Sequence, residues 1–116
     1  AYTPGSSARV VELPQAAAHL VASRRYAAVV CVGVVIRGET PHFEFVAREA
    51  GAGIGQVALS TGVPVTFGVI TALTEKQAWD RAGGKIGNRG EEAAAAAVEM
   101  IHLIRSLKRA RKRRRG

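Results

Sequence analysis

The chain has little sulfur and few aromatic side chains: its 116 residues include one cysteine, one tryptophan, two tyrosines and three phenylalanines. A single cysteine cannot form an intrachain disulfide, which excludes a secreted domain held by disulfides and makes the cytoplasm the expected compartment. No apolar run is long enough to cross a bilayer, and residues 1–7 lack the basic and then apolar order of a signal peptide. The length fits one domain with one modest core.

Acidic residues are absent after Glu99, and this absence explains where the net charge of +8 lies. Residues 1–104 hold nine basic and nine acidic residues and sum to zero, so the domain body is not a basic nucleic-acid-binding surface. The other eight basic residues all lie between positions 105 and 115. We therefore expect a domain over residues 1–108 and a basic, flexible tail over residues 109–116, because the like charges of the tail repel one another.

Apolar segments alternate with helical patterns along the chain. Residues 27–33 form a valine-rich run ending in glycine, which is typical of a parallel strand buried on both faces, and residues 65–70 form a second such run. Helices are predicted near residues 14–24, 41–59, 74–82 and 90–108, the third opened by a capping box of Thr74 and Gln77. This order predicts an α/β protein with a parallel sheet and right-handed crossovers.

The segment between the first strand and the second helix is the most informative part of the sequence. Residues 33–45 read Gly-Val-Val-Ile-Arg-Gly-Glu-Thr-Pro-His-Phe-Glu-Phe. Thr40 suits the N-cap and Pro41 the first helical position, so free backbone N–H groups at this helix start can hold an anion. His42 beside such a site is a candidate proton shuttle, although a histidine in a first turn can also serve as a surface or capping residue.

Three segments together resemble the 6,7-dimethyl-8-ribityllumazine synthase family. They are residues 33–45, residues 64–71 (Pro-Val-Thr-Phe-Gly-Val-Ile-Thr) and residues 80–90 (Asp-Arg-Ala-Gly-Gly-Lys-Ile-Gly-Asn-Arg-Gly). The similarity extends from about Val11 to about Leu107. It implies a three-layer, flavodoxin-like fold with four parallel strands in the order 2-1-3-4 and helices on both faces.

Only the third and fourth family strands are visible in this sequence, so we expect the N-terminal strand and helix to be missing from this chain. The absent first strand would lie between the second and the third. Its absence would leave the edge of a buried-type strand uncovered, which favours aggregation. The chain is then a fragment, or one that receives a strand in trans, or a domain with a short, reduced sheet.

The resemblance also implies a transferase reaction. The family joins 5-amino-6-ribitylaminouracil to 3,4-dihydroxy-2-butanone 4-phosphate, with loss of phosphate and water and without a metal or other cofactor. Family active sites lie between neighbouring subunits of a pentamer. The short connection at residues 84–88 resembles members that close into sixty-subunit icosahedral shells, so a pentamer or such a shell is expected.

Four residues match the chemical and phosphate positions of the family. His42 matches the histidine that transfers protons. Arg81 matches the arginine that holds the substrate phosphate, a role that suits its planar guanidinium, although a solvated cation at a helix end is the alternative. Glu39 and Thr40 match positions whose backbone N–H groups contact the phosphate.

A further group of positions matches the pyrimidine and ribityl contacts. These positions are Val10, Val11, Glu12, Val34, Val35, Ile36, Phe67 and Arg89. The Glu12 carboxylate would accept hydrogen bonds from ribityl hydroxyls, or would simply be a charge at a helix start. For Phe67 the alternative role is packing in the core. The family has lysine where Arg89 stands, and a small turn residue where Arg9 and Val10 stand.

The basic tail favours a different class of function. A subunit that kept the fold and lost catalysis could act as a shell or scaffold whose tail binds nucleic acid or anionic cargo without sequence preference. The simpler interpretation is a solvated chain end. No aromatic residue interleaves with the charges, so base stacking is not indicated. No membrane partner is expected.

Overall fold

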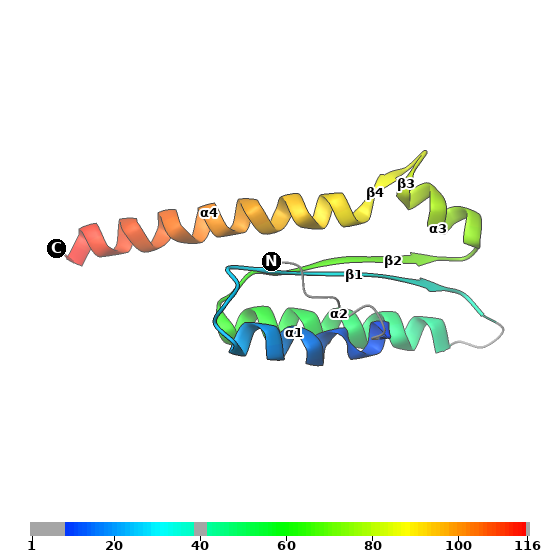
Figure 1. Cartoon of the computed structure of the whole chain (residues 1–116), viewed down its shortest axis with the longest axis horizontal. Coiled ribbons are helices and arrows are strands. Elements are labelled where there is room, and N and C mark those ends of the chain that lie inside the picture. The colour runs from blue at the N-terminus through cyan, green and yellow to red at the C-terminus, as the bar shows by residue number, and fades with distance from the viewer. Residues whose placement is uncertain (1–8, 39–41, 116) are drawn as a thin grey trace.

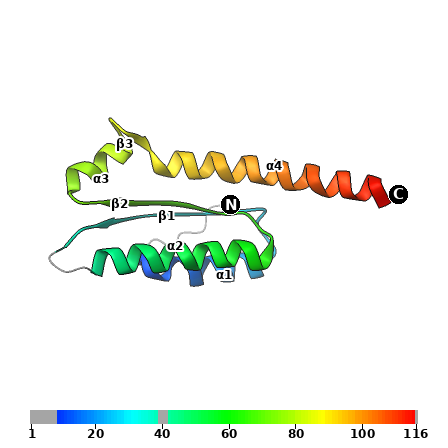
Figure 2. The same cartoon turned by 180° about the vertical axis from the view of Figure 1, so that it is seen from behind.

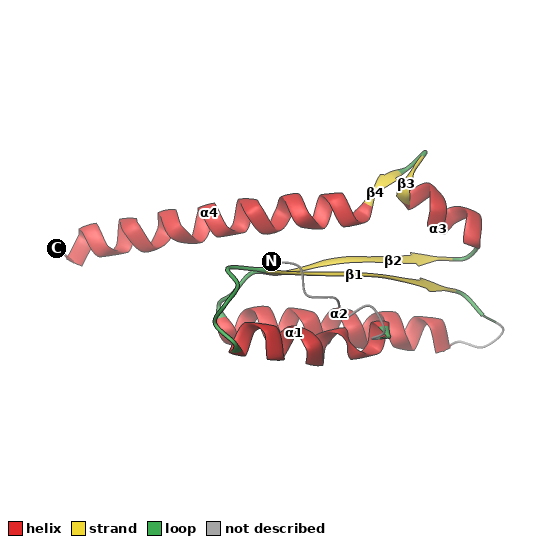
Figure 3. Ribbon diagram, in the orientation of Figure 1, coloured by secondary structure: helices red, strands yellow, loops and turns green. Residues whose placement is uncertain are grey.

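Three layers make up the molecule in the computed structural model, which describes residues 9–38 and 42–115 (Figure 1). The middle layer is a sheet of two parallel strands, β1 (Val29–Ile36) and β2 (Val65–Ala72). Helices α1 (Leu13–Ala22) and α2 (His42–Thr61) cover one face, and the short 3-10 turn η1 (Val10–Glu12) leads into α1. Helices α3 (Glu75–Arg81) and α4 (Arg89–Arg115) lie on the other side (Figures 2 and 3). The predicted α/β class with flanking helices is confirmed.

The two strands pair in parallel along their whole length. The register aligns Val29 with Val65 and Ile36 with Ala72. Two further bonds extend the ladder at its ends: Val29 N–H donates to the Pro64 carbonyl, and Arg37 N–H donates to the Ala72 carbonyl, each at 2.9 Å. Both strands are longer than the apolar runs predicted, because pairing continues through residues that the sequence marked only as strand ends.

One face of β1 is exposed, so the prediction of a strand buried on both faces is wrong for the described chain. Val29 and Cys31 face α1 and α2 and are buried. Four side chains on the opposite face are between 38% and 54% exposed: Val30, Val32, Val34 and Ile36. The reason is that α4 packs mainly over β2, where the Thr66 hydroxyl donates to the Ala93 carbonyl at 2.8 Å.

The main core lies between the sheet and the pair α1 and α2. Ile54 is its largest fully buried side chain, at 2% exposure. The two helices approach closely at Gly53, where a Cβ atom would lie 2.6 Å from Pro14 Cγ. Because a proline ring cannot rotate away, only glycine permits this contact.

Helix α3 begins with the predicted cap, but one of its partners differs. The Thr74 hydroxyl accepts a hydrogen bond from Gln77 N–H at 3.1 Å, as expected. The Gln77 side chain accepts from Leu73 N–H at 2.9 Å instead of from the cap residue itself. After α3 the chain forms a small antiparallel hairpin, β3 (Ala82–Gly84) with β4 (Gly87–Asn88), where the sequence indicated only a short connection.

Helix α4 continues to Arg115, although the sequence predicted its end near Lys108. Repulsion between like charges favours fraying there, whereas the negative end of the helix dipole favours cations in the last turn. The C-terminal part of α4 extends past the end of the sheet (Figures 1 and 2). Its basic residues are therefore carried away from the body of the domain on a helix.

Candidate functional site

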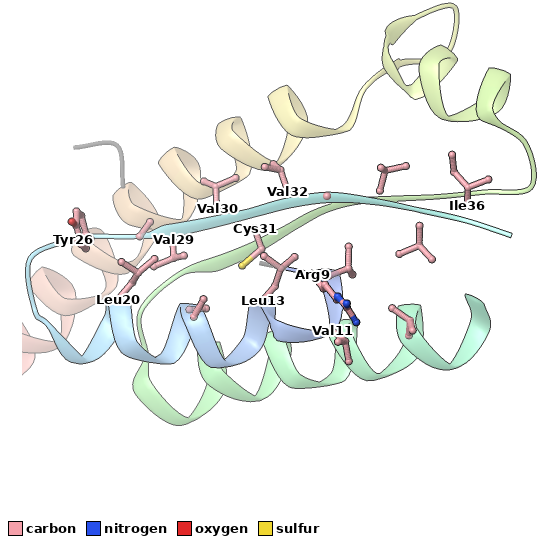
Figure 4. Close-up of a pocket in the computed structure, with 18 of the residues that line it drawn as sticks. Arg9, Val11, Leu13, Leu20, Tyr26, Val29, Val30, Cys31, Val32 and Ile36 are labelled. Carbon is pink, nitrogen blue, oxygen red and sulfur yellow. The ribbon is translucent and has the colours of Figure 1, made fainter. Parts of the chain in front are cut away.

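A groove of about 1050 Å³ runs along the edge of β1 that is not paired with β2, where η1, α1 and the start of α2 also contribute to its lining (Figure 4). Every residue of β1 contributes to its wall, and most of the lining is aliphatic. Within the described part of the chain, β1 pairs with β2 along one edge only. No described strand pairs with its other edge, so the backbone N–H and C=O groups there are available to a ligand or to another strand.

The groove gathers six of the residues predicted for the site. They come from three separate parts of the sequence and are Val10, Val11, Val34, Val35, Ile36 and His42. The turn η1 meets the strand closely, since a Cβ atom on Gly33 would lie 2.9 Å from Val10 Cγ2. The apolar wall and the strand's backbone groups can hold a flat ring by its faces and its polar edge.

His42 is the first residue of α2 in the described chain and lies exposed at the groove. Its imidazole packs beside the Phe45 ring, with ring centroids 6.5 Å apart and planes inclined by 24°. The histidine is thus positioned at the boundary between the apolar groove and solvent. Glu39 and Thr40, the predicted phosphate contacts, lie outside the described residues.

Glu12 is not part of the groove wall. Its carboxylate accepts a hydrogen bond from Arg9 N–H at 3.2 Å and so helps to close the turn η1. This contact holds the carboxylate beside the turn that leads into α1. Its side chain remains exposed, so other lone pairs of the carboxylate stay available.

The groove also contains polar residues that the sequence interpretation did not select. Arg9 was noted only as a bulky departure from the family pattern, yet its side chain lines the groove, as does Tyr26 near the other end (Figure 4). No sequence motif marks either residue. Their positions follow from the packing of η1 and of the α1–β1 connection against the strand, which spacing alone does not reveal.

Three predicted residues lie away from the groove. Phe67 projects from β2 toward α2, where its Cζ lies 3.9 Å from the position a Gly51 Cβ would take. Arg81 donates to the Gln77 carbonyl at 3.0 Å on its own helix, and Arg89 forms a 2.8 Å ion pair with Glu92. Within one copy of the described chain, these three residues are therefore separate from the predicted site residues of the groove.

Cys31 lies in the groove wall but is not a nucleophile at neutral pH. Burial raises the pKa of its thiol from 9.0 to about 11, because the thiolate would lose its hydration. Among residues 9–38 and 42–115, no group of three or more His, Cys, Asp or Glu side chains is arranged to hold a metal ion. Over the same residues, no helix is long and apolar enough to span a membrane.

These features define a three-layer α/β domain with a ligand-sized groove along its parallel sheet. The family model of 6,7-dimethyl-8-ribityllumazine synthase matches residues 4–105, so the chain belongs to this family. Two proteins named 6,7-dimethyl-8-ribityllumazine synthase are close relatives. The one from Syntrophus aciditrophicus (strain SB) is 52% identical over 96 residues, which cover 83% of this chain. The one from Edwardsiella ictaluri (strain 93-146) is 56% identical over 97 residues, which cover 84% of this chain.

The matched part of this chain covers 62% of the length of each of these relatives. Family membership and the α/β fold predicted from the three motifs are confirmed. The family match ends at residue 105, so most of the basic residues between positions 105 and 115 lie outside it. The roles assigned to individual site residues stay predictions.

Proposed function

We propose that this chain takes part in forming 6,7-dimethyl-8-ribityllumazine, as a cytoplasmic transferase of riboflavin biosynthesis. The substrates would be 5-amino-6-ribitylaminouracil and 3,4-dihydroxy-2-butanone 4-phosphate. The single observation that carries the proposal is the groove, which brings His42 together with the strand end Val34–Ile36 in a chain of this family. No cofactor is needed for the condensation.

The groove suits the pyrimidine substrate. A uracil ring has flat apolar faces and an edge of alternating N–H and C=O groups. Aliphatic side chains such as Val10 and Val35 would cover the faces. The open backbone groups of Val34–Ile36 would pair with the edge, which would fix the orientation of the ring.

His42 would move protons during the reaction. Imine formation between the amine and the ketone releases water, elimination releases phosphate, and ring closure releases water again. Each step needs a proton delivered or removed, and an exposed imidazole at the groove can do both. The start of α2 would stabilise the departing phosphate, because the first N–H groups of a helix attract anions.

The active site would be shared between two copies of the chain. Arg81, Arg89 and Phe67 lie outside the groove of their own copy, and they would meet the groove of a neighbour. Such a head-to-tail contact closes into a ring. This arrangement supports a homo-oligomer, either a pentamer or a sixty-subunit shell, and the short connection at residues 84–88 favours the shell.

The test is a condensation assay of the purified chain with both substrates, following lumazine absorbance. His42→Ala should lower kcat on the order of a hundredfold, since a positioned acid–base group contributes at least that much. His19→Ala is the matched control, because His19 is also an exposed helix histidine but lies outside the groove. Equal rates for the two variants would remove His42 from the mechanism.

A second candidate function is binding of nucleic acid or other anionic cargo by the basic C-terminal part of α4. What favours it is the position of this part, which lies on an exposed helix beyond the family match. A chain that bound cargo and showed no turnover would be a shell or scaffold subunit. A chain that did both would be an enzyme with an added binding surface.

A further inference from the structure

The basic segment, residues 105–115, is a dense and unneutralised array of charge. It contains eight lysines and arginines and no acidic residue. All of its residues are exposed, and it lies wholly within α4. The ion pairs of the described residues are Lys76–Asp80 and Arg89–Glu92, so none of the eight cations is paired. Among the described residues, the side-chain hydrogen bond of this segment joins Arg109 to Ser106 at 3.4 Å.

The spacing of these charges matches that of a nucleic-acid duplex. Eleven helical residues extend over about 16 Å. Eight cations over this length give one positive charge per roughly 2 Å, and duplex DNA carries one negative charge per about 1.7 Å of its axis. The linear charge density of the segment is therefore close to that of a duplex and opposite in sign.

The charges also surround the helix. Successive residues advance by about 100° around the axis. Arg113, Arg114 and Arg115 therefore point in three directions about 100° apart, and the other cations fill most of the remaining circumference. A membrane-surface helix needs an apolar face instead, and after Leu107 the only apolar residue of the segment is Ala110. Phosphates must then approach from more than one side.

We propose that residues 105–115 bind duplex DNA as a preformed helix lying in the major groove, without preference for base sequence. The major groove is about 12 Å wide and accepts an α-helix, with phosphates on both flanks. The major groove of duplex RNA is too narrow and deep for this. The segment has no aromatic residue on which bases of a single strand could stack. The proposal does not depend on the catalytic one.

Two variants distinguish the contribution of charge to DNA binding from the contribution of helical structure. In the first, Arg111, Lys112, Arg113, Arg114 and Arg115 are changed to Gln, which removes charge and keeps high helix propensity. In the second, Ala110→Pro keeps every charge and breaks the helix. Ala110→Gln is the matched control for the second, since it changes the same position without breaking the helix. Circular dichroism and size-exclusion chromatography would confirm that the folded domain is retained in each.

Binding would be measured by fluorescence anisotropy with a mixed-sequence DNA of about 20 base pairs and with the single strand of equal length, from about 50 to 200 mM salt. For the unmodified chain, contacts to about six phosphates predict a slope of log K against log salt near −5. The five-Gln variant should at least halve this slope. Ala110→Pro should weaken duplex binding roughly tenfold and leave single-strand binding unchanged, and Ala110→Gln should bind like the unmodified chain.

Several results would overturn the proposal. An unchanged affinity and slope in the five-Gln variant would show that the segment is not the binding surface. Equal duplex binding by Ala110→Pro would show that charge alone acts and that no helix enters the groove. Duplex RNA or anionic vesicles bound as tightly as duplex DNA would show a general polyanion or membrane surface instead.

Discussion

The thiol of Cys31 shows how burial in the groove wall changes the ionisation of one side chain. Its side chain is 4% exposed, and burial raises the pKa of the thiol to about 11, so the folded state favours the neutral form. A group whose pKa is raised on folding stabilises the protein below its ordinary pKa of 9.0 and loses this contribution as pH rises toward 11. The groove should therefore remain apolar and the thiol unreactive throughout the neutral range.

We expect the free energy of unfolding to fall between pH 9 and about 11, by on the order of 2 kcal/mol, because over this range the thiol ionises in the unfolded chain while burial keeps it neutral in the folded one. Cys31→Ala lacks the titrating group and should not show this part of the loss. Urea titrations of both proteins at each pH would isolate it as a difference, since the two proteins differ at position 31 alone. If the free energies of unfolding of the two proteins changed by the same amount across this range, the raised pKa of Cys31 would be contradicted.

The residues that reach the groove could be predicted in part. His42 and Val34–Ile36 lie in one continuous motif, so the strand end and the helix start place them together once the βα unit forms. Val10 reaches the groove because η1 meets Gly33, a contact between segments far apart in the sequence. Arg9 and Tyr26 were missed because tertiary packing alone brings them there.

The contact between α1 and α2 depends on one glycine. At Gly53 a Cβ atom would lie 2.6 Å from Pro14 Cγ and 2.7 Å from Pro14 Cβ, whereas at Gly55 nothing lies within 4 Å. Both positions are interior to α2, so both gain the same helix propensity from alanine. Alanine substitutions at these two positions therefore separate the effect of packing against α1 from the effect of helix propensity.

Gly53→Ala should lower the free energy of unfolding by about 1–2 kcal/mol, because the stiff proline ring forces the two helices apart. Gly55→Ala should raise it by about 0.5–1 kcal/mol through propensity alone. Urea midpoints at constant slope would measure both changes. Similar gains in the two variants would show that α1 moves aside at no cost.

At the level of elements, the sequence predicted the two long strands, their parallel pairing and the start of α1, α2, α3 and α4 to within one residue. The 3-10 turn η1 and the hairpin of β3 and β4 were not predicted. Apolar runs and capping residues such as Thr74 determine these features locally. The exposed face of β1 was not predicted, because a run of valines indicates burial but not which helix provides it. The length of α4 was missed because charge repulsion was weighed more heavily than the helix dipole.

Across the whole molecule, the described chain separates its predicted site residues into two groups. The groove holds His42, and α3 holds Arg81 on its own helix. The exposed apolar face of β1 and the open strand edge add surface that a single copy leaves uncovered. A shared site between copies accounts for both observations, since assembly would bring the groups together and cover this surface.

The most direct test of the shared site mixes two inactive variants. His42→Ala and Arg81→Ala would each be assembled alone, and then unfolded, mixed in equal amounts and reassembled together. If one copy supplies His42 and its neighbour supplies Arg81, about a quarter of the sites in the mixture contain both intact residues, and lumazine formation should recover to about that fraction. A mixed assembly that stays as inactive as either variant alone would contradict the account, because both residues would then act within one copy.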